Sequence, residues 1–299
     1  MEDEIKNLLL QLQHFIEKLE PILPRTEEID WQSTLAAIWT REHLVGYLEP
    51  IDNLHATRLD DLLQIERQKE ALRVNTAQFC QGLPANNVLL WGARGTGKSS
   101  LIHALLNEFH EQGIRLVELQ KSNFQDFGKI VSLLKDQPYR FLIVCDDLSF
   151  DHTDSSFKEL KSILEGSVAA TTNNILLYAT SNRRHLVAEN MRDNLSASYD
   201  NGELHESDAV EEKISLSDRF GLWLSFYPFS QEQYLEVTIH WLQQLANTVG
   251  CEFSVTDTVK AEALRWALNR GVRNGRTAYY FAKHYIGQIQ LNASQGLKS

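Results

Sequence analysis

Residues 88–99 read VLLWGARGTGKS, an apolar run followed by a glycine-rich turn that ends in Lys98 and Ser99. The turn satisfies the pattern G-x-x-x-x-G-K-S/T in full. Apolar side chains then recur at helical spacing over residues 100–109. A strand, a glycine-rich turn and a helix in this order predict a P-loop, whose backbone N–H groups and helix amino terminus surround a chain of phosphates. The predicted phosphate-binding residues are Gly92, Ala93, Arg94, Gly95, Thr96, Gly97, Lys98, Ser99 and Ser100.

The chemistry of this turn indicates which ligand it binds. In P-loops the lysine, here Lys98, reaches the β- and γ-phosphates, and the hydroxyl of the next residue, here Ser99, ligates Mg²⁺. The chain contains no Asn-Lys-x-Asp motif, which reads guanine in small GTPases, and no Gly-x-Ser-x-Gly elbow of a serine hydrolase. The predicted ligands are therefore a nucleotide and Mg²⁺, and the resemblance described below implies that the nucleotide is ATP.

A second apolar stretch ends in two carboxylates. Residues 141–145 read FLIVC and are followed by Asp146 and Asp147. A Walker B strand has this form, in which one acid holds Mg²⁺, usually through water, and the next acts on the attacking water. We therefore predict that Asp146 is a metal ligand together with Ser99, and that Asp147 is catalytic. The alternative is a strand that ends in an ordinary polar turn, which is less plausible for two aspartates at the sheet edge where α/β proteins bind ligands.

Two other groups of polar residues follow this strand. The apolar run 175–179 leads to Asn182, whose amide either contacts the γ-phosphate or the attacking water, or only caps the strand end. Downstream of the two carboxylates, Asp151, His152 and Asp154 have the spacing of neither an EF-hand nor a zinc site. These three residues are predicted to lie on the surface of a loop.

The rest of the chain from residue 88 onward predicts an α/β core and a helical region. Segments of helical spacing separate five short apolar runs at 88–91, 116–119, 141–145, 175–179 and 222–226. Such continuous apolar strands are typical of a parallel sheet that is covered on both faces. After Pro228 the strands stop, and helices are expected at 230–246, 256–269 and 275–290. This change predicts a second, all-helical subdomain.

The part of the chain before the P-loop is expected to be helical. An apolar stripe with helical period runs through residues 5–23, a second helix is expected at 31–48, and a third at 60–80. The first stripe either packs on its own domain or serves as a docking face for a partner.

The composition limits the possible functions. The chain has 299 residues, which allow one large domain or two smaller ones, and its formal net charge is −11. This charge argues against a nucleic-acid coat or a membrane-surface protein, although it is compatible with a local basic groove. A membrane-spanning helix needs about twenty apolar residues, and every apolar run in the chain is much shorter. The amino terminus, MEDE, lacks the basic region of a secretory signal. We expect a cytoplasmic protein with reduced cysteines.

Residues 189–213 are strongly acidic. The segment holds eight Asp and Glu residues against one Arg and one Lys, and so carries −6 of the net charge of −11. Its Asn-Gly pair and scattered serines offer no packing face, which favours a solvated loop. A regulatory or partner-contacting loop is the alternative.

The order of these motifs resembles that of AAA+ ATPases: a P-loop, an acidic strand, a strand ending in Asn182, then Arg219 before a strand, and Arg276 in a helical lid. The chain is most similar to a bacterial family of single-domain AAA+ ATP-binding proteins of undefined physiological role. The similar segments are RGTGKSSLIHALL, FLIVCDDLSF, LKSILEG, YATSNRRHLV, EEKISLSDRFGLWLSF and RGVRNGRTA. They fall within residues 59–281.

The resemblance implies a fold and a set of roles. The fold is an α/β AAA+ P-loop NTPase with a parallel five-stranded sheet in the order 5-1-4-3-2. It would comprise an N-terminal helical region at 1–55, a nucleotide-binding core at 56–228 and a helical lid at 229–299. The implied roles are sensor 1 for Asn182, arginine finger for Arg219, sensor 2 for Arg276 and, within the adenine-contacting stretch 62–66, base contact for Ile65.

Two positions depart from most AAA+ proteins. Asp147 stands where glutamate is common, and Gln64 stands where glycine is frequent. The resemblance implies an ATPase that assembles into a homo-oligomer and remodels a partner, either an unidentified protein client, which we favour, or a nucleic acid, with no membrane partner. Because the acid at 147 is one methylene shorter, the alternative is a nucleotide-dependent switch or scaffold with slow or no hydrolysis.

Overall fold

The computed structural model describes residues 5–7, 11–15, 28–42, 45–54, 56–150, 156–164, 173–184, 186, 198–200, 203–205 and 218–296. The predictions for Asp151, His152 and Asp154, and for most of the acidic segment 189–213, lie outside these residues. Among the helices of the described part, none is both long and apolar enough to cross a membrane.

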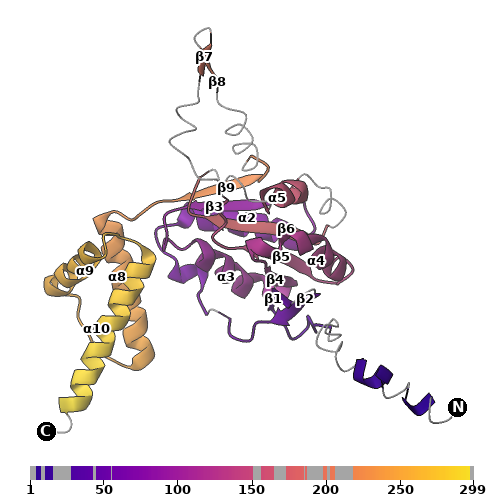
Figure 1. The fold of residues 1–299 in the computed structure, drawn as a ribbon. Helices are drawn as coiled ribbons and strands as arrows, with labels where there is room; N and C mark the ends of the chain where they lie inside the picture. The colour runs from indigo at the N-terminus through magenta and orange to yellow at the C-terminus, as the bar shows by residue number, and fades with distance from the viewer. Residues whose placement is uncertain are drawn as a thin grey trace.

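A seven-stranded sheet forms the centre of the molecule (Figure 1). Its strands stand in the order β2-β1-β4-β5-β6-β3-β9. Their bounds are β1 Ala36–Glu42, β2 Val45–Pro50, β3 Val88–Gly92, β4 Ile114–Glu118, β5 Arg140–Cys145, β6 Ile175–Ser181 and β9 Leu222–Phe226. Neighbouring strands are parallel, except that β2 runs antiparallel to β1. All the predicted apolar runs are therefore strands of one sheet.

The strand order agrees with the resemblance, but the size of the sheet does not. The strands predicted from the sequence are neighbours in the order β9-β3-β6-β5-β4. Numbered among themselves along the chain, they stand in the order 5-1-4-3-2. The predicted total of five strands is wrong, because β1 pairs with β4 and β2 extends the sheet further.

The predicted helix over residues 31–48 is also wrong, so the amino-terminal region is not wholly helical. Ala36 and Ala37 are buried in different hydrophobic clusters on opposite faces of the sheet, which is the alternation of a strand. Gly46 permits the close pairing of β2 with β1, because a Cβ at this position would lie 2.2 Å from Cζ2 of Trp39. Hydrogen bonds with β4 satisfy backbone N–H and C=O groups of β1. Local sequence propensity does not reveal this pairing with a strand that is distant in the chain.

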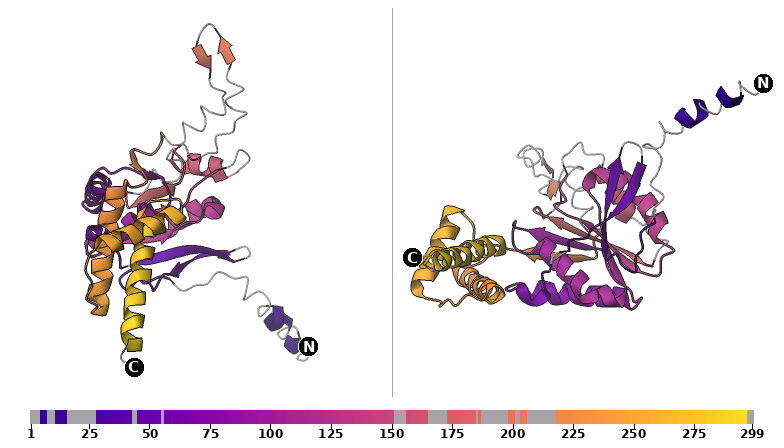
Figure 2. Two further views of the ribbon diagram at one scale, coloured as in Figure 1. Left: turned by 90° about the vertical axis from the view of Figure 1, so that its left-hand side faces the viewer. Right: turned by 90° about the horizontal axis from the view of Figure 1, so that it is seen from below.

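Helices cover both faces of the sheet (Figures 1 and 2). One face packs against α2 (Glu66–Cys80) and α3 (Lys98–Phe109), and the other packs against α4 (Phe127–Leu134) and α5 (Ser156–Leu164). Short 3₁₀ helices are η2 Leu59–Asp61, η3 His110–Gln112 and η4 Lys121–Asp126. The central strands are therefore buried on both sides, as their continuous apolar sequences predicted.

Three helices after β9 form a separate body, here called the lid (Figure 1). They are α8 Gln231–Val249, α9 Asp257–Asn269 and α10 Gly275–Gly296, and they share a hydrophobic cluster of their own. The Ser230 side chain caps α8 by accepting a hydrogen bond from the backbone N–H of Gln233, whose side chain in turn accepts from Ser230 N–H. The predicted helices are present, and the boundary between residues 228 and 229 stays a prediction.

Two segments lie outside the sheet and its covering helices, and both bear on alternatives that the sequence left open. They are the amino-terminal stripe and the acidic segment. The described parts of the amino-terminal stripe, residues 5–7 and 11–15, are helical. Their apolar side chains are exposed, at 55% for Ile5 and 60% for Phe15, so these residues do not support a stripe packed on its own domain. In the acidic segment, where a loop was expected, β7 Ser198–Asp200 and β8 Glu203–His205 pair as antiparallel strands.

Candidate functional site

A cavity with a volume of about 870 Å³ lies at the carboxyl ends of β3, β5 and β6. One end is lined by the P-loop and by Asp146, Asp147, Thr180 and Asn182. The other end is lined by the stretch before α2 and by side chains of the lid. The site residues predicted after three separate strands therefore meet in one place, as expected for a parallel sheet.

The P-loop holds Lys98 by its own backbone. Gly95 and Gly97 have φ angles of 74° and 101°, and α3 begins directly afterwards at Lys98. The Lys98 ammonium donates to the carbonyls of Gly92 and Ala93, each at 2.8 Å, and to Oδ1 of Asn182 at 3.3 Å. Burial lowers the pKa of Lys98, although the nearby carboxylates oppose this shift. The loop thus presents a cation and the amino terminus of a helix to the cavity.

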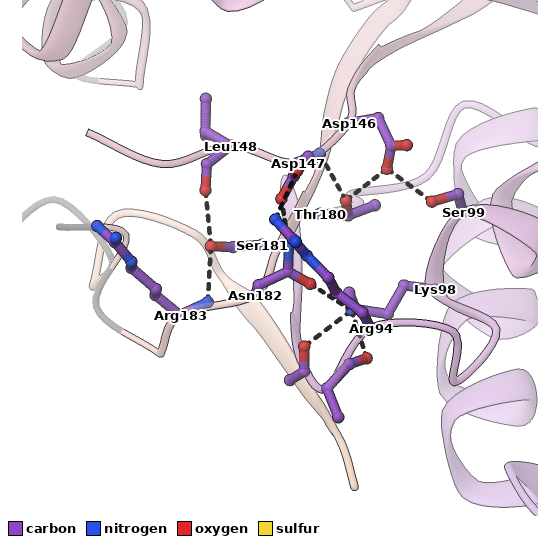
Figure 3. Close-up of polar contacts among 12 residues, drawn as sticks. Arg94, Lys98, Ser99, Asp146, Asp147, Leu148, Thr180, Ser181, Asn182 and Arg183 are labelled. Atoms are coloured by element: carbon purple, nitrogen blue, oxygen red, sulfur yellow. Dashed lines mark hydrogen bonds and ion pairs between the residues drawn. The ribbon is translucent and has the colours of Figure 1, made fainter. Parts of the chain in front are cut away.

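Asp146 is held by two hydroxyl groups. Its Oδ1 accepts a hydrogen bond from Ser99 Oγ at 2.6 Å and another from Thr180 Oγ1 at 2.5 Å (Figure 3). The predicted metal ligands Ser99 and Asp146 are therefore in direct contact. Hydroxyl and carboxylate oxygens are the protein ligands that suit Mg²⁺, which also retains waters and takes phosphate oxygens from a nucleotide.

Asp147 contacts the residue that follows β6 and a residue of the P-loop. Its Oδ1 accepts a short hydrogen bond from Asn182 Nδ2, and its Oδ2 lies 3.4 Å from Nη2 of Arg94 (Figure 3). The backbone of Asp147 has a φ of 51°, a left-handed conformation that is uncommon outside glycine. The predicted catalytic pair Asp147 and Asn182 is thus brought together, and Arg94 of the P-loop lies beside it.

Thr180 is a site residue that sequence reasoning missed. Its hydroxyl donates to Asp146 and accepts from the backbone N–H of Asp147 at 3.0 Å, so it holds the carboxylate of Asp146 and the backbone of Asp147. The residue lies in β6 and is 1% exposed. The available signal was a polar side chain at the end of an otherwise apolar strand, next to a strand that carries two acids.

The opposite end of the cavity is aromatic and comes largely from the lid. Trp241 of α8 and Tyr279 of α10 both line it, with their ring centroids 5.0 Å apart in an edge-to-face arrangement. Ile65, predicted to contact the base, also lines this end and is 4% exposed. Gln64 has a φ of 68°, and its Nε2 donates to Glu236 of α8 at 2.6 Å. A flat apolar group such as a nucleobase suits this end.

The lid also contacts the P-loop directly. Arg276 lines the cavity, and its backbone N–H donates to the carbonyl of Gly95 at 3.1 Å. Asn274 is 5% exposed, and its Nδ2 donates to the carbonyl of Arg94 at 2.7 Å. Sequence reasoning predicted Arg276 and missed Asn274.

Arg219 is the predicted site residue that the structure does not bring to the others. It lies in the turn before β9 and is half-buried. In the described part of the chain, Arg219 is not among the residues that line the cavity.

Groups of three or more His, Cys, Asp or Glu side chains that could hold a metal are absent from the described residues. A metal at Asp146 would therefore depend on a hydroxyl, waters and phosphates.

Comparison with known proteins establishes the family. The model of the family described as "Protein of unknown function (DUF815)" matches residues 32–289. This chain therefore belongs to that family.

Curated relatives are similar over smaller parts of the chain. The Replication factor C large subunit of Methanococcus vannielii is 27% identical over 184 residues, which are 58% of this chain and 36% of that protein. The corresponding subunit of Ignicoccus hospitalis is 35% identical over 75 residues, or 24% of this chain and 15% of that protein. The chain thus spans about a third or less of the length of these relatives.

Among solved structures, a variant of RuvB from Thermotoga maritima is similar, with a TM-score of 0.50 and 18% identity. The likeness covers 77% of this chain and 65% of the RuvB chain, and at this identity it concerns the fold alone. With the family match and the strand order, these findings confirm the resemblance to AAA+ ATPases and the α/β AAA+ P-loop fold.

Proposed function

We propose that this member of the family binds and hydrolyses ATP with Mg²⁺ in an oligomer and uses the reaction to remodel a partner. One observation carries the proposal. The polar side chains predicted after three separate strands meet at one end of a cavity whose other end is aromatic. They are Lys98, Ser99, Asp146, Asp147 and Asn182. A nucleoside triphosphate has complementary chemistry, with charged phosphates at one end and a flat base at the other.

Each residue of the polar end has a proposed role. Lys98 moves from the P-loop carbonyls to the β- and γ-phosphates, and backbone N–H groups of residues 94–100, which line the cavity, surround the phosphates. Ser99 and Asp146 hold Mg²⁺, which neutralises charge on the phosphates when it is bound. Asp147 accepts a proton from the water that attacks the γ-phosphorus, and Asn182 orients that water. The products are ADP and inorganic phosphate.

The place of Arg219 supports the proposed assembly. Among the described residues, those that line the cavity do not include Arg219. We therefore propose that Arg219 acts as a finger on the γ-phosphate that a neighbouring copy binds, while Arg276 acts on the phosphates of its own chain. Fingers of this kind accelerate phosphoryl transfer by roughly 10³–10⁵.

Multi-turnover phosphate release tests the proposed reaction. Wild-type release should greatly exceed that of Lys98→Ala, which should also lose ATP binding while remaining folded, because Lys98 is a charge for the phosphates rather than a core group. Arg219→Ala should bind ATP almost normally and hydrolyse it at background. Mixing Arg219→Ala with Lys98→Ala should recover part of the turnover, because the two proteins supply different halves of a composite site.

A second function is favoured by the surroundings of Asp147. This acid is one methylene shorter than the usual glutamate, and its Oδ2 lies 3.4 Å from Nη2 of Arg94, so part of its carboxylate contacts an arginine instead of the attacking water. ATP binding without multi-turnover release would support a nucleotide-dependent switch or scaffold. Strictly monomeric behaviour with a bound ATP analogue would also favour the switch.

Two classes of partner are proposed, a protein and a nucleic acid. A protein client agrees with the net charge of −11, which opposes binding to a polyanion. The names of the curated relatives refer to replication, so a nucleic-acid client is the alternative. Capture by an Asp147→Asn variant in the ATP-bound state would distinguish the two, because it retains ATP and holds the client.

A further inference from the structure

Asn274 lies where the lid meets the P-loop. It immediately precedes α10 and is 5% exposed. Its amide nitrogen donates to the carbonyl of Arg94 at 2.7 Å, and its amide oxygen accepts from the backbone N–H of Thr277 at 2.8 Å. The second bond is that of a helix N-cap. One buried side chain therefore caps a lid helix and holds the P-loop at the same time.

The neighbouring backbone strengthens this contact. The N–H of Arg276 donates to the carbonyl of Gly95 at 3.1 Å, so two successive P-loop carbonyls accept hydrogen bonds from the start of α10. The approach requires glycine in the loop. A Cβ at Gly95 would lie 2.6 Å from Nδ2 of Asn274 and 3.0 Å from Cβ of Arg276.

These bonds leave the phosphate-binding groups of the loop available. The carbonyls of Arg94 and Gly95 accept from the lid, whereas phosphates are bound by N–H groups. A change in the loop on phosphate binding would therefore be transmitted through its carbonyls to the amino terminus of α10. Arg276 is the second residue of that helix, so its position in the cavity depends on the same cap.

We propose that Asn274 is a positioning residue that couples nucleotide binding at the P-loop to ordering of the lid, by capping α10 and holding the Arg94 carbonyl with one side chain. The proposal rests on the proposed nucleotide function of the cavity. It makes Asn274 responsible for coupling, while Arg276 touches the phosphates.

Two substitutions separate the two bonds of Asn274. Asn274→Ser retains an oxygen that can cap α10 but is too short to reach the Arg94 carbonyl, whereas Asn274→Ala removes both bonds. Thr256→Ala is the matched control, because Thr256 caps α9 by accepting from Val259 N–H at 3.3 Å. It removes a cap in the same lid, and the contacts described for Thr256 lie within the lid.

Hydrogen–deuterium exchange of the full chain, with and without a non-hydrolysable ATP analogue and Mg²⁺, provides the readout. In the wild type, the analogue should protect both residues 94–106 and the first turns of α10. In Asn274→Ser, residues 94–106 should still be protected, the protection of α10 should be lost, and the analogue should bind about tenfold more weakly. Thr256→Ala should retain both protections and wild-type affinity.

The outcomes distinguish this proposal from the proposed function. A wild-type chain that does not bind the analogue would overturn both. Normal binding by the wild type, combined with unchanged affinity and unchanged protection of α10 in Asn274→Ser, would overturn the coupling role alone. Equal loss of α10 protection in Asn274→Ser and Thr256→Ala would also overturn it, because the effect would then be a general destabilisation of the lid and not the loss of the bond to Arg94.

Discussion

At the P-loop end of the cavity, the proposed functional groups are linked to one another by hydrogen bonds, whereas at the lid end they are mainly aromatic rings in contact. Thr180 bonds to Asp146 and to the backbone of Asp147, and Asn182 bonds to both Asp147 and Lys98. In contrast, Trp241 and Tyr279 of the lid meet edge to face, and Trp241 packs against the separate core of the lid.

This difference indicates what each end can do. A network of short polar contacts on a central sheet fixes charges for chemistry before the ligand arrives. The lid has its own hydrophobic cluster, and its described polar contacts with the core include Glu236 with Gln64, Asn274 with Arg94 and Arg276 with Gly95. A body joined by few bonds can change its position at low cost, which suits a nucleotide sensor. Chemistry and sensing would thus belong to opposite ends of one cavity.

The largest expected effect is on chemistry at the P-loop end. Asp147→Asn should lower ATP turnover by about 10²–10⁴-fold, because an amide cannot accept a proton from the attacking water. ATP affinity should change little, since the lysine and the Mg²⁺ ligands remain. Steady-state phosphate release and equilibrium ATP binding measure the two quantities.

The control for charge is Asp136→Asn, which removes an exposed carboxylate outside the cavity. Turnover by this variant should equal that of the wild type. Unchanged turnover in Asp147→Asn would move the role of base to another group and weaken the division between the two ends.

A smaller loss of ATP turnover is expected when the hydrogen bonds that Thr180 makes to Asp146 and Asp147 are removed. Thr180→Val is nearly isosteric but leaves the Asp147 N–H without its hydroxyl partner, so turnover should fall about tenfold and stability by about 1–3 kcal/mol. Thr180→Ser retains the hydroxyl and should restore most of both. If valine and serine behave alike in phosphate release and urea unfolding, the hydroxyl does not position the acids.

At the lid end, the expected loss concerns affinity for the base. Trp241→Ala should weaken ATP binding by about tenfold, because stacking a base on an aromatic ring contributes about 1–3 kcal/mol. Binding of inorganic tripolyphosphate should not change, since that ligand has no base. Trp241→Phe retains a ring and serves as the control. Equal losses for ATP and tripolyphosphate would show that the two ends are not separate.

The P-loop end was largely predictable because short motifs encode it. Lys98, Ser99, Asp146 and Asn182 each follow an apolar strand, and the carboxyl ends of parallel strands meet at one edge of a sheet. Thr180 escaped prediction because threonine is common in strands, so a hydroxyl at the end of an apolar strand is only a weak signal of a functional residue.

The lid end and the sheet edge were less predictable for different reasons. Trp241 and Tyr279 lie in helices where aromatic residues at helical spacing usually form a core, so their exposure to the cavity needs tertiary information. Asn274 contacts a residue 180 positions earlier in the chain. In β1, the alanines at 36 and 37 favour helix locally, and pairing with β4 overrides that preference.

The smallest expected effect concerns Lys98 in the absence of nucleotide. Burial lowers its pKa below the ordinary value for lysine of 10.5, while Asp146 and Asp147 oppose the shift and Arg276 and Arg94 add to it. Between the lowered pKa and 10.5, the unfolded chain binds more protons at this residue than the folded chain does. The contribution of Lys98 to folding stability therefore rises with pH through this window.

Comparison of the wild type with Lys98→Met isolates this contribution. The free energy of unfolding in urea, measured without nucleotide, should rise in the wild type relative to Lys98→Met as the pH increases toward 10.5. The stabilisation of the wild type by ATP should fall over the same window, because the phosphates require the charged ammonium. A difference between wild type and Lys98→Met that is constant or falls with pH would contradict the idea that the P-loop end holds its lysine buried before phosphate binds.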